Sequence, residues 1–560
     1  MSVANHRAAH AHPRHPGPAL TVESDAVSDH TTAPARWWEG AVIYQIYPRS
    51  FADGDGDGIG DLRGIAGRLD HLRGTDESLG VDAIWLSPIY PSPLHDFGYD
   101  ISDYTDVAPE YGTLADLDAL IDACHARGLR FLLDLVPCHT SIEHPWFADS
   151  RISRDSPKRD WYIWADPAVD GGPPSNWTAM FGGGTWEWEP ATEQYYLHSF
   201  YPEQPDLNWR NPVVADAMAE VMRFWLRRGV DGFRVDAIFA AIKDDLLRDN
   251  PPDRRPHAIP GLGGDDGHDP LWSLNRPEVH DVIRHLRSVA AEFPGRVLVG
   301  EAYLPVEELA SYLGNGTDDE FDLAFNFELL LSPWEHRHLT LAIERSEALH
   351  PPGAMPTYAF SNHDQSRHAT RWGPERARLA AFLLLTLRGV AVLYAGEEIG
   401  MVDADPSALP QPPFDRAGRD AYRTPMQWDA SDHGGFTSGD PWLPLVDPES
   451  RNAADQATDP GSTLSLYRRL IAARRTSPAL AHGEHRSLFG VGADVLAWLR
   501  EADGERVLVL LNVGSSARRC DLRRVAATAG KVVVATGERN GRVELTDLEL
   551  RPFEGIALRL

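Results

Sequence analysis

The segment Gly232-Phe233-Arg234-Val235-Asp236 is a short apolar run that ends at a carboxylate. The same arrangement returns in Val299-Gly300-Glu301-Ala302 and in Phe360-Ser361-Asn362-His363-Asp364. In each case a strand-like segment gives way to a loop at an acid. The carboxyl ends of parallel strands form the active face of a (β/α)8 barrel, so an acid at such an end is placed for chemistry. The pattern predicts a barrel with these three acids at one end.

Short β-rich runs alternate with helical patterns from Trp37 onward. Thr113 is expected to cap a helix that ends at Gly128, and Asn211-Pro212 to begin another that ends at Gly229. The strand candidates are residues 42–48, 82–88, 130–136, 231–236, 297–301, 322–327, 356–361 and 390–395. Strands that alternate with crossover helices predict an α/β fold, a closed (β/α)8 TIM barrel over residues 37–138 and 208–479.

Three further segments stand apart from the barrel pattern. Residues 139–207, rich in Gly, Pro and Trp, are too long for a simple loop and are expected to form an inserted domain after strand 3. Residues 480–560 alternate in hydrophobicity between turn residues, which predicts a C-terminal antiparallel β domain. Residues 1–36 are rich in His, Ala and Pro without an apolar core, so we expect a disordered tail rather than a signal peptide.

The amino-acid composition excludes several classes of protein and of binding partner. A hydrophobic content of 42% in 560 residues, with 17 Trp, allows a large packed core and excludes wholesale disorder. The formal charge of −30 argues against nucleic acid or an anionic membrane as a partner. Only three cysteines are present, too few and too scattered for a disulfide framework, so we expect a cytoplasmic protein. We expect a monomer or homodimer that acts on a small molecule.

Three carboxyls at one face are suited to cleaving a glycosidic bond, which needs one carboxylate to attack and one acid to protonate the leaving oxygen. Asp236, held ionised by Arg234, is the candidate nucleophile. Glu301 is the candidate acid/base, with a pKa raised by burial or by a nearby carboxylate. Asp364, beside His363, would grip sugar hydroxyls. Each acid alone could instead be a salt-bridged or helix-capping residue without a catalytic role, but the three together favour an active site.

Other candidate residues carry weaker signals. His139 ends the third strand in Asp134-Leu-Val-Pro-Cys-His139 and either donates to a substrate hydroxyl or satisfies buried backbone. Tyr99 and Asp100 follow the second strand and offer a stacking face and a hydrogen-bonding carboxylate. Without other information, a tyrosine in such a position is more often part of the hydrophobic core than a stacking surface for a ligand.

The loop Asp53-Gly-Asp55-Gly-Asp57-Gly-Ile59-Gly-Asp61 presents alternating carboxylates at a spacing that Ca²⁺ favours. It is not an EF-hand, because Gly64 stands at the twelfth position and no helix pattern precedes it. We expect a structural Ca²⁺ site rather than an unliganded acidic turn.

The chain resembles the α-amylase superfamily, family thirteen of the glycoside hydrolases, and within it the α-glucosidase and oligo-1,6-glucosidase branch. The resemblance runs from Trp37 to the C-terminus and rests on these motifs: VIYQIYPRSF, DGDGDGIGDLRGI, WLSPIYPSP, GYDISDY, DLVPCHTS, QPDLNW, GFRVDA, GEAYLP, NHDQSR, YAGEEIGM and RTPMQW. It implies a (β/α)8 barrel with a domain B after strand 3 and a C-terminal β-sandwich. It also implies a retaining mechanism through a covalent β-glucosyl enzyme.

The resemblance assigns roles by motif. Asp236 resembles the nucleophile, Glu301 the acid/base and Asp364 the transition-state stabiliser. The remaining substrate ligands implied are Arg234, His139 and His363 around the glucosyl unit, Tyr99 as stacking aromatic, Asp100 paired with Arg419 at the non-reducing end, and Phe181 and Phe200 at the pocket mouth. The implied Ca²⁺ ligands are Asp53, Asp55, Asp57, Asp61 and the Ile59 carbonyl.

The chain departs from the family pattern at a few positions. Cys138 replaces the usual Asn before His139, which leaves the local hydrogen bonding open, and Ser366 replaces a frequent Pro. Ala237 follows the nucleophile, where Ala or Thr resembles enzymes that prefer α-1,4 links and Val those that prefer α-1,6. The difference of one or two methyl groups is worth roughly 1–3 kcal/mol and tilts specificity without deciding it.

These features predict an exo-acting α-glucosidase that releases glucose from the non-reducing ends of short α-glucosides, with α-1,4 links favoured. One rival is a transglucosylase, such as a trehalose synthase or a sucrose-acting enzyme, with the same covalent intermediate. A second rival, of another class, is a catalytically dead scaffold, which the three acids argue against.

Overall fold

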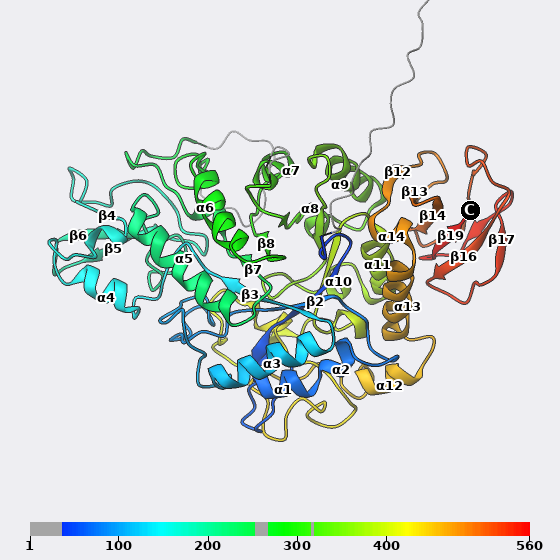
Figure 1. Ribbon diagram of the computed structural model, residues 1–560, viewed down its shortest axis with the longest axis horizontal. Coiled ribbons are helices and arrows are strands. Elements are labelled where there is room, and N and C mark those ends of the chain that lie inside the picture. The colour runs from blue at the N-terminus through cyan, green and yellow to red at the C-terminus, as the bar shows by residue number, and fades with distance from the viewer. Residues whose placement is uncertain (1–35, 253–266, 315–317) are drawn as a thin grey trace, which may run out of the picture. The chain divides into compact units, whose positions relative to one another are not determined.

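The computed structural model describes residues 36–252, 267–314 and 318–560. The expected disordered tail lies outside the described residues up to residue 35. Within these ranges eight strands form one parallel sheet in the order β10-β11-β1-β2-β3-β7-β8-β9. A parallel bridge between Phe325 and Thr357 joins its two ends, and helices surround it (Figure 1). The expected (β/α)8 barrel is confirmed. Its strands are β1 Val42–Ile46, β2 Ala83–Leu86, β3 Arg130–Leu135, β7 Gly232–Val235, β8 Val297–Gly300, β9 Leu323–Ala324, β10 Thr357–Ala359 and β11 Val390–Tyr394.

The register of the central strands brings the acids together. Val235 of β7 pairs with Gly300 of β8, so Asp236 and Glu301 each follow immediately after paired residues. The Asp236 amide donates to Leu135 of β3 at 2.8 Å, and the Glu301 amide donates to Val235 at 2.9 Å. The two acids therefore leave neighbouring strands at the same level of the barrel.

Capping residues set the helix boundaries. Thr113 and Asp116 form a reciprocal capping box at the start of α3, and Asn211 accepts from the Val213 amide at the start of α5. The helices expected at both positions are confirmed. The α-helices of the described ranges are α1 Leu62–Gly67, α2 Leu69–Leu72, α3 Leu114–Ala126, α4 Pro145–Arg151, α5 Pro212–Arg227, α6 Val279–Ala291, α7 Val306–Leu309, α8 Glu328–Leu331, α9 His336–Leu349, α10 His368–Arg371, α11 Pro374–Thr386, α12 Ala453–Thr458, α13 Thr463–Thr476 and α14 Pro478–His482.

The long connection after β3 has a sheet of its own. Strands β4 Trp164–Ala165, β5 Trp186–Glu189 and β6 Gln194–Leu197 pair antiparallel, and α4 precedes them. Trp177, Trp186 and Leu197 form a small apolar cluster there. The two ends of this connection lie next to each other where they join the barrel, because His139 and Asp206 form an antiparallel β-bridge.

The C-terminal part is antiparallel, as expected. In the part of the chain that the structure covers, its main sheet has the order β12-β13-β14-β19-β16-β17, and β15 pairs with β18. A separate apolar cluster includes Leu508, Cys520 and Leu550 from both sheets. The strands are β12 Glu484–Ser487, β13 Val495–Ala502, β14 Glu505–Asn512, β15 Arg518–Arg519, β16 Ala529–Ala535, β17 Arg542–Glu544, β18 Glu549–Leu550 and β19 Gly555–Arg559. Among the described helices, none has the length and apolar character needed to cross a bilayer.

Candidate active site

A cavity of about 270 Å³ opens at the carboxyl ends of the barrel strands. Its volume lies just below the usual range for ligand pockets, which suits one sugar unit better than a long chain. The walls come from the barrel, from the connection after β3 and from the segment after β11. They are lined by Asp96, Tyr99, His139, Met180, Phe181, Phe200, Asp236, Ala237, Phe239, Glu301, Tyr303, Asp364, Gln365, Ala417, Arg419 and Tyr422.

One guanidinium holds both predicted catalytic carboxyls. Nη1 of Arg234 lies 2.6 Å from Asp236 Oδ1, and its Nη2 lies 2.6 Å from Glu301 Oε1. Arg234 is 2% exposed and stands behind the two acids, so it contacts the carboxyls rather than the cavity. Its Nη1 also donates to Asp134 Oδ1 at 2.6 Å. The shared cation keeps Asp236 and Glu301 side by side on one wall.

The electrostatics of this cluster favour one retained proton. Burial raises the pKa of Glu301 to about 7, against the opposing effect of Arg234. Burial likewise raises the pKa of Asp236 and of Asp134 to about 7, and Arg234 again opposes the shift. Arg234 therefore does not outweigh burial at Asp236, contrary to the expectation that it holds this carboxylate ionised. Three carboxyls surround one cation, so ionising all of them together is unfavourable. The arrangement supplies a protonated acid beside an ionised carboxylate near neutral pH.

Asp364 lies in a different electrostatic setting. Burial opposes its charged form, but the positive charges of Arg419 and Arg423 outweigh burial and hold the pKa of Asp364 below its usual range. Arg419 Nη1 lies 2.9 Å and Arg423 Nη2 lies 3.2 Å from its Oδ1. The carboxylate of Asp364 therefore stays ionised near neutral pH, where the neighbouring cluster of Asp236 and Glu301 retains a proton.

The two predicted histidines differ in position. His139 lines the cavity, and its Nε2 lies 3.1 Å from the Tyr99 carbonyl oxygen. His363 is fully buried behind the wall, with its Nε2 2.6 Å from the Tyr99 hydroxyl and 3.1 Å from Asp364 Oδ2. Burial lowers the pKa of His363 to about 3, so its ring is neutral. The structure therefore makes His363 a support for Tyr99 and Asp364 rather than part of the cavity wall.

The pairing expected between Asp100 and Arg419 is wrong. Asp100 is fully buried and accepts hydrogen bonds from Ser92 Oγ and from the amides of His95 and Asp96, so its carboxylate organises its own loop. Asp96 makes the contact instead: its Oδ1 accepts from Nη2 of Arg419, and it lines the cavity. The sequence offers two acids, one on each side of Gly98-Tyr99, and only the loop path distinguishes them.

Aromatic residues from the connection after β3 stand at the cavity wall. Phe181 and Phe200 lie 5.7 Å apart between ring centroids, and Phe181 is 38% exposed. The Arg419 guanidinium lies 5.1 Å from the Phe181 ring, which joins this connection to the segment after β11. Both phenylalanines line the cavity.

Several residues of the site carry no distinct sequence signal. Asp134, Asp415 and Arg423 are buried and hold the arginines or Asp364 in place. Asp134 has a partial signal, because it stands near the end of the third strand in the motif that contains His139. Arg423 begins the RTPMQW motif, but the motif does not indicate that Asp364 is its partner. Asp415 pairs with Arg419, four residues along the chain, and the segment between them shows no pattern that predicts this contact.

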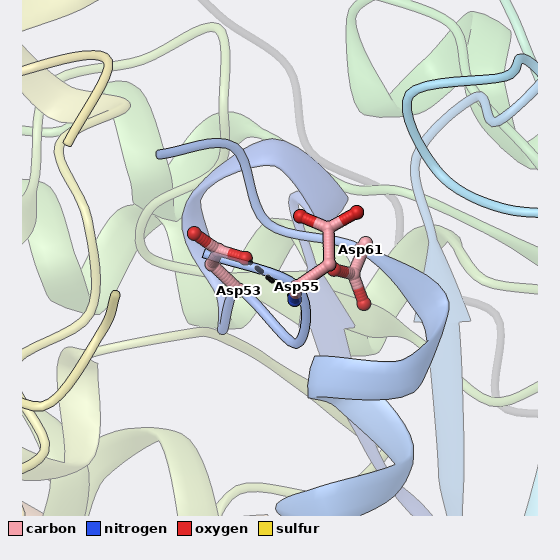
Figure 2. Close-up of side chains that lie close together, drawn as sticks. All are labelled: Asp53, Asp55 and Asp61. Carbon is pink, nitrogen blue, oxygen red and sulfur yellow. Dashed lines mark hydrogen bonds between the residues drawn. The ribbon is translucent and has the colours of Figure 1, made fainter. Parts of the chain in front are cut away.

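In the acidic loop 53–61, some of the expected Ca²⁺ ligands lie close together. Oxygens of Asp53, Asp55 and Asp61 lie within 4.8 Å of one another (Figure 2). Asp61 also caps α1 by accepting from a backbone amide. Asp57 is outside this group, and its Oδ1 accepts from the Ile59 amide at 2.8 Å. Three carboxylates close together are hard oxygen donors that fit a cation such as Ca²⁺.

Comparison with known proteins gives consistent matches. The family described as "Alpha amylase, catalytic domain" matches residues 45–483. A "Probable alpha-glucosidase" of Rhizobium meliloti (strain 1021) is 44% identical over 512 residues, which cover 87% of this chain and 91% of the relative. An oligo-1,6-glucosidase of Heyndrickxia coagulans is 37% identical over 530 residues, 86% of this chain and 92% of the relative. The solved structure of an α-glucosyl transfer enzyme matches with a TM-score of 0.84 at 39% identity, over 94% of this chain and 99% of its own. The chain belongs to the α-amylase catalytic-domain family of glycoside hydrolases.

Proposed function

We propose that this protein is a retaining, exo-acting α-glucosidase that removes terminal glucose from short α-glucosides. The observation that carries the proposal is the contact of Asp236 and Glu301 with one guanidinium at the wall of a small cavity. A retaining enzyme needs its two carboxyls about 5–5.5 Å apart, without room for an intervening water. Two carboxyls bound to adjacent nitrogens of Arg234 suit that requirement.

The proposed reaction has two steps. Asp236 attacks the anomeric carbon while Glu301 gives its proton to the glycosidic oxygen, which leaves a covalent glucosyl enzyme and a free alcohol. Glu301, now ionised, removes a proton from water, and the resulting attack releases glucose and restores both carboxyls. Asp364, kept ionised by Arg419 and Arg423, stabilises positive charge on the sugar ring and accepts hydrogen bonds from its hydroxyls.

The far end of the cavity supports exo action. Arg419 contacts Asp96 and Asp364, and we place this network beyond the non-reducing end of the bound glucosyl unit. Asp96 and Arg419 both line the cavity and offer charged hydrogen-bonding groups to the terminal hydroxyls. A chain that continues beyond the non-reducing end would have to displace this ion pair, so the site favours terminal residues.

The small side chain of Ala237 supports a preference for α-1,4 links such as those of maltose. The relatives named α-glucosidase and oligo-1,6-glucosidase support hydrolysis. Initial rates on maltose, isomaltose, sucrose and trehalose test the assignment: maltose is expected to be the best of the four. No hydrolysis of any of them, or of p-nitrophenyl α-glucoside, would instead support the scaffold reading.

A second candidate is glucosyl transfer to a sugar acceptor, and the similarity to an α-glucosyl transfer enzyme favours it. The two activities share the covalent intermediate and differ in whether water or an alcohol captures it. Free glucose and new oligosaccharide are to be measured at rising maltose concentration. Mostly glucose at low maltose supports hydrolysis, whereas mostly oligosaccharide at low maltose supports transfer.

We also propose that loop 53–61 binds Ca²⁺ through Asp53, Asp55 and Asp61, with Asp57 and the Ile59 carbonyl as further ligands. The bound ion would stabilise the loop by screening its carboxylates from one another. A cytoplasmic location is proposed as well, and the three unpaired, buried thiols support it.

A further inference from the structure

The side chain of Cys138, which the proposed reaction does not use, lies beneath the turn that follows Asp236. Cys138 is 1% exposed, and its Sγ lies 3.1 Å from the carbonyl oxygen of Ala237. The carbonyl oxygen of Asp236 is farther away, at 3.9 Å. Burial raises the pKa of this thiol well above its ordinary value, so the sulfur keeps its proton and acts as a donor.

Ala237 has a backbone conformation that residues other than glycine rarely adopt. Its φ is 40° and its ψ is 34°, in the left-handed region. Such a conformation persists only where the surroundings hold it. From this turn the Ala237 amide donates to Glu301 Oε2 at 3.1 Å, while the Ala237 carbonyl accepts from Cys138. The two peptide groups of one residue therefore connect the thiol to the proposed acid/base.

The position of the thiol is set independently of this turn. The carbonyl of Cys138 accepts from the Leu207 amide at 2.9 Å. The neighbouring Pro137 carbonyl accepts from the Trp209 indole at 2.7 Å. These bonds tie the chain after β3 to the end of segment 139–207, so the S–H group is a fixed donor against which the turn after β7 can be held.

We propose that Cys138 is a positioning residue that holds the left-handed turn at Ala237 and, through the Ala237 amide, fixes the orientation and proton affinity of Glu301. This inference rests on the proposed function of Glu301. The charged groups that face Glu301 are Arg234, Asp134, Asp236 and Asp364, and the thiol also faces Lys243 and Asp206. Substitution of Cys138 removes none of these charged groups, so a shift in the pH profile would result from a change in the turn at Ala237.

Loss of the S–H donor has a definite consequence. The Ala237 carbonyl also accepts from the Ala240 amide at 2.9 Å, so it would lose one of its two donors. The strained turn would then be held less firmly and would relax. The Ala237 amide stabilises the ionised form of Glu301, so a weaker bond raises the pKa of Glu301. The basic limb of the pH profile would move to higher pH, and kcat/KM would fall about fivefold, the effect of one neutral hydrogen bond. KM would change little, because Cys138 does not line the cavity.

The experiment compares Cys138→Ala with Cys138→Ser, which keeps a donor, and with Cys124→Ala, which removes an equally buried thiol on α3. The measurements are kcat and KM on p-nitrophenyl α-glucoside between about pH 5 and pH 9, and the melting temperature. Where Cys138→Ala does not fold, Cys138→Val takes its place as the variant without a donor.

The proposal predicts a lower kcat and a raised basic limb for Cys138→Ala, with both restored in Cys138→Ser. Cys124→Ala is expected to lower the melting temperature and leave the pH profile unchanged. A wild-type pH profile in Cys138→Ala, or equal losses in Cys138→Ala and Cys138→Ser, would overturn the proposal. Wild-type protein without hydrolysis would overturn the proposed function instead.

Discussion

Arg234 is the residue on which the chemistry of the site converges. Its guanidinium contacts Asp134, Asp236 and Glu301, and it is 2% exposed. In such a buried setting the cation stabilises ionised carboxyls, yet a single positive charge does not balance three negative ones. The cluster therefore favours one protonated and one ionised carboxyl, which is what the proposed roles of Glu301 and Asp236 require.

Replacing Asp236 by Asn tests the nucleophile. The amide keeps the shape but does not form the covalent intermediate, so we expect kcat on p-nitrophenyl α-glucoside to fall by at least about 10³-fold. Asp216→Asn, on the exposed face of α5, is the control and should keep wild-type activity. Substantial turnover by Asp236→Asn with an intact fold would rule out its proposed role.

The pH dependence of kcat/KM tests Glu301. Burial raises the pKa of this carboxyl to about 7, and it must be protonated to act as the acid. Activity is therefore expected to fall as pH rises through about 7, since the proton is lost there. Burial also raises the pKa of Asp236 to about 7, and Asp236 must be ionised to attack, so activity is expected to fall on the acid side as well. Asp364, with a pKa held below its usual range, should stay ionised throughout and add no limb near neutrality. A rate that stays level well above pH 7 would contradict this assignment.

At the scale of elements, the path of loop 92–100 could not be predicted from sequence patterns. Leu94 and Phe97 both have positive φ values, 66° and 45°, and these turns bring Asp96 rather than Asp100 to Arg419. Leucine and phenylalanine are not residue types that predict a turn with positive φ. The strands and the helices α3 and α5 were predictable because apolar runs and capping residues act locally. The two-residue strands β15 and β18 were not, since so short a strand shows no alternation.

Paired variants separate the roles of the two acids in this loop. Asp96→Asn removes a charged partner of Arg419 at the cavity, so we expect KM for maltose to rise about tenfold or more. Asp100→Asn weakens the hydrogen bonds within the loop, so the melting temperature should fall with a smaller change in KM. The opposite ranking of KM between the two variants would restore the pairing first expected for Asp100.

The acidic loop 53–61 supplies a prediction at the same scale. Removal of Ca²⁺ with a chelator should lower the melting temperature by about 3 °C or more, and added Ca²⁺ should restore it, because an ion that binds the folded state stabilises it. Asp55→Asn removes one of the gathered carboxylates and should abolish this response. An identical melting temperature with chelator and with Ca²⁺ would exclude the site.

At the scale of the whole molecule, the barrel turns distant segments into one site. Asp96 follows β2, Asp236 follows β7, Glu301 follows β8 and Arg419 follows β11. The sequence predicts that strand ends meet, so it predicts Asp236, Glu301 and Asp364 together. It does not predict partners such as Arg423, whose contact with Asp364 depends on the path of the segment after β11.

The stereochemistry of the released glucose tests the central claim most directly. Proton NMR of maltose hydrolysis, read in the first minutes before mutarotation, distinguishes the two anomers of the sugar freed from the non-reducing end. Attack by Asp236 followed by attack of water inverts the anomeric carbon twice, so α-glucose is the expected first product. β-Glucose as the first product would mean that water attacks directly, and the paired roles of Asp236 and Glu301 would be wrong.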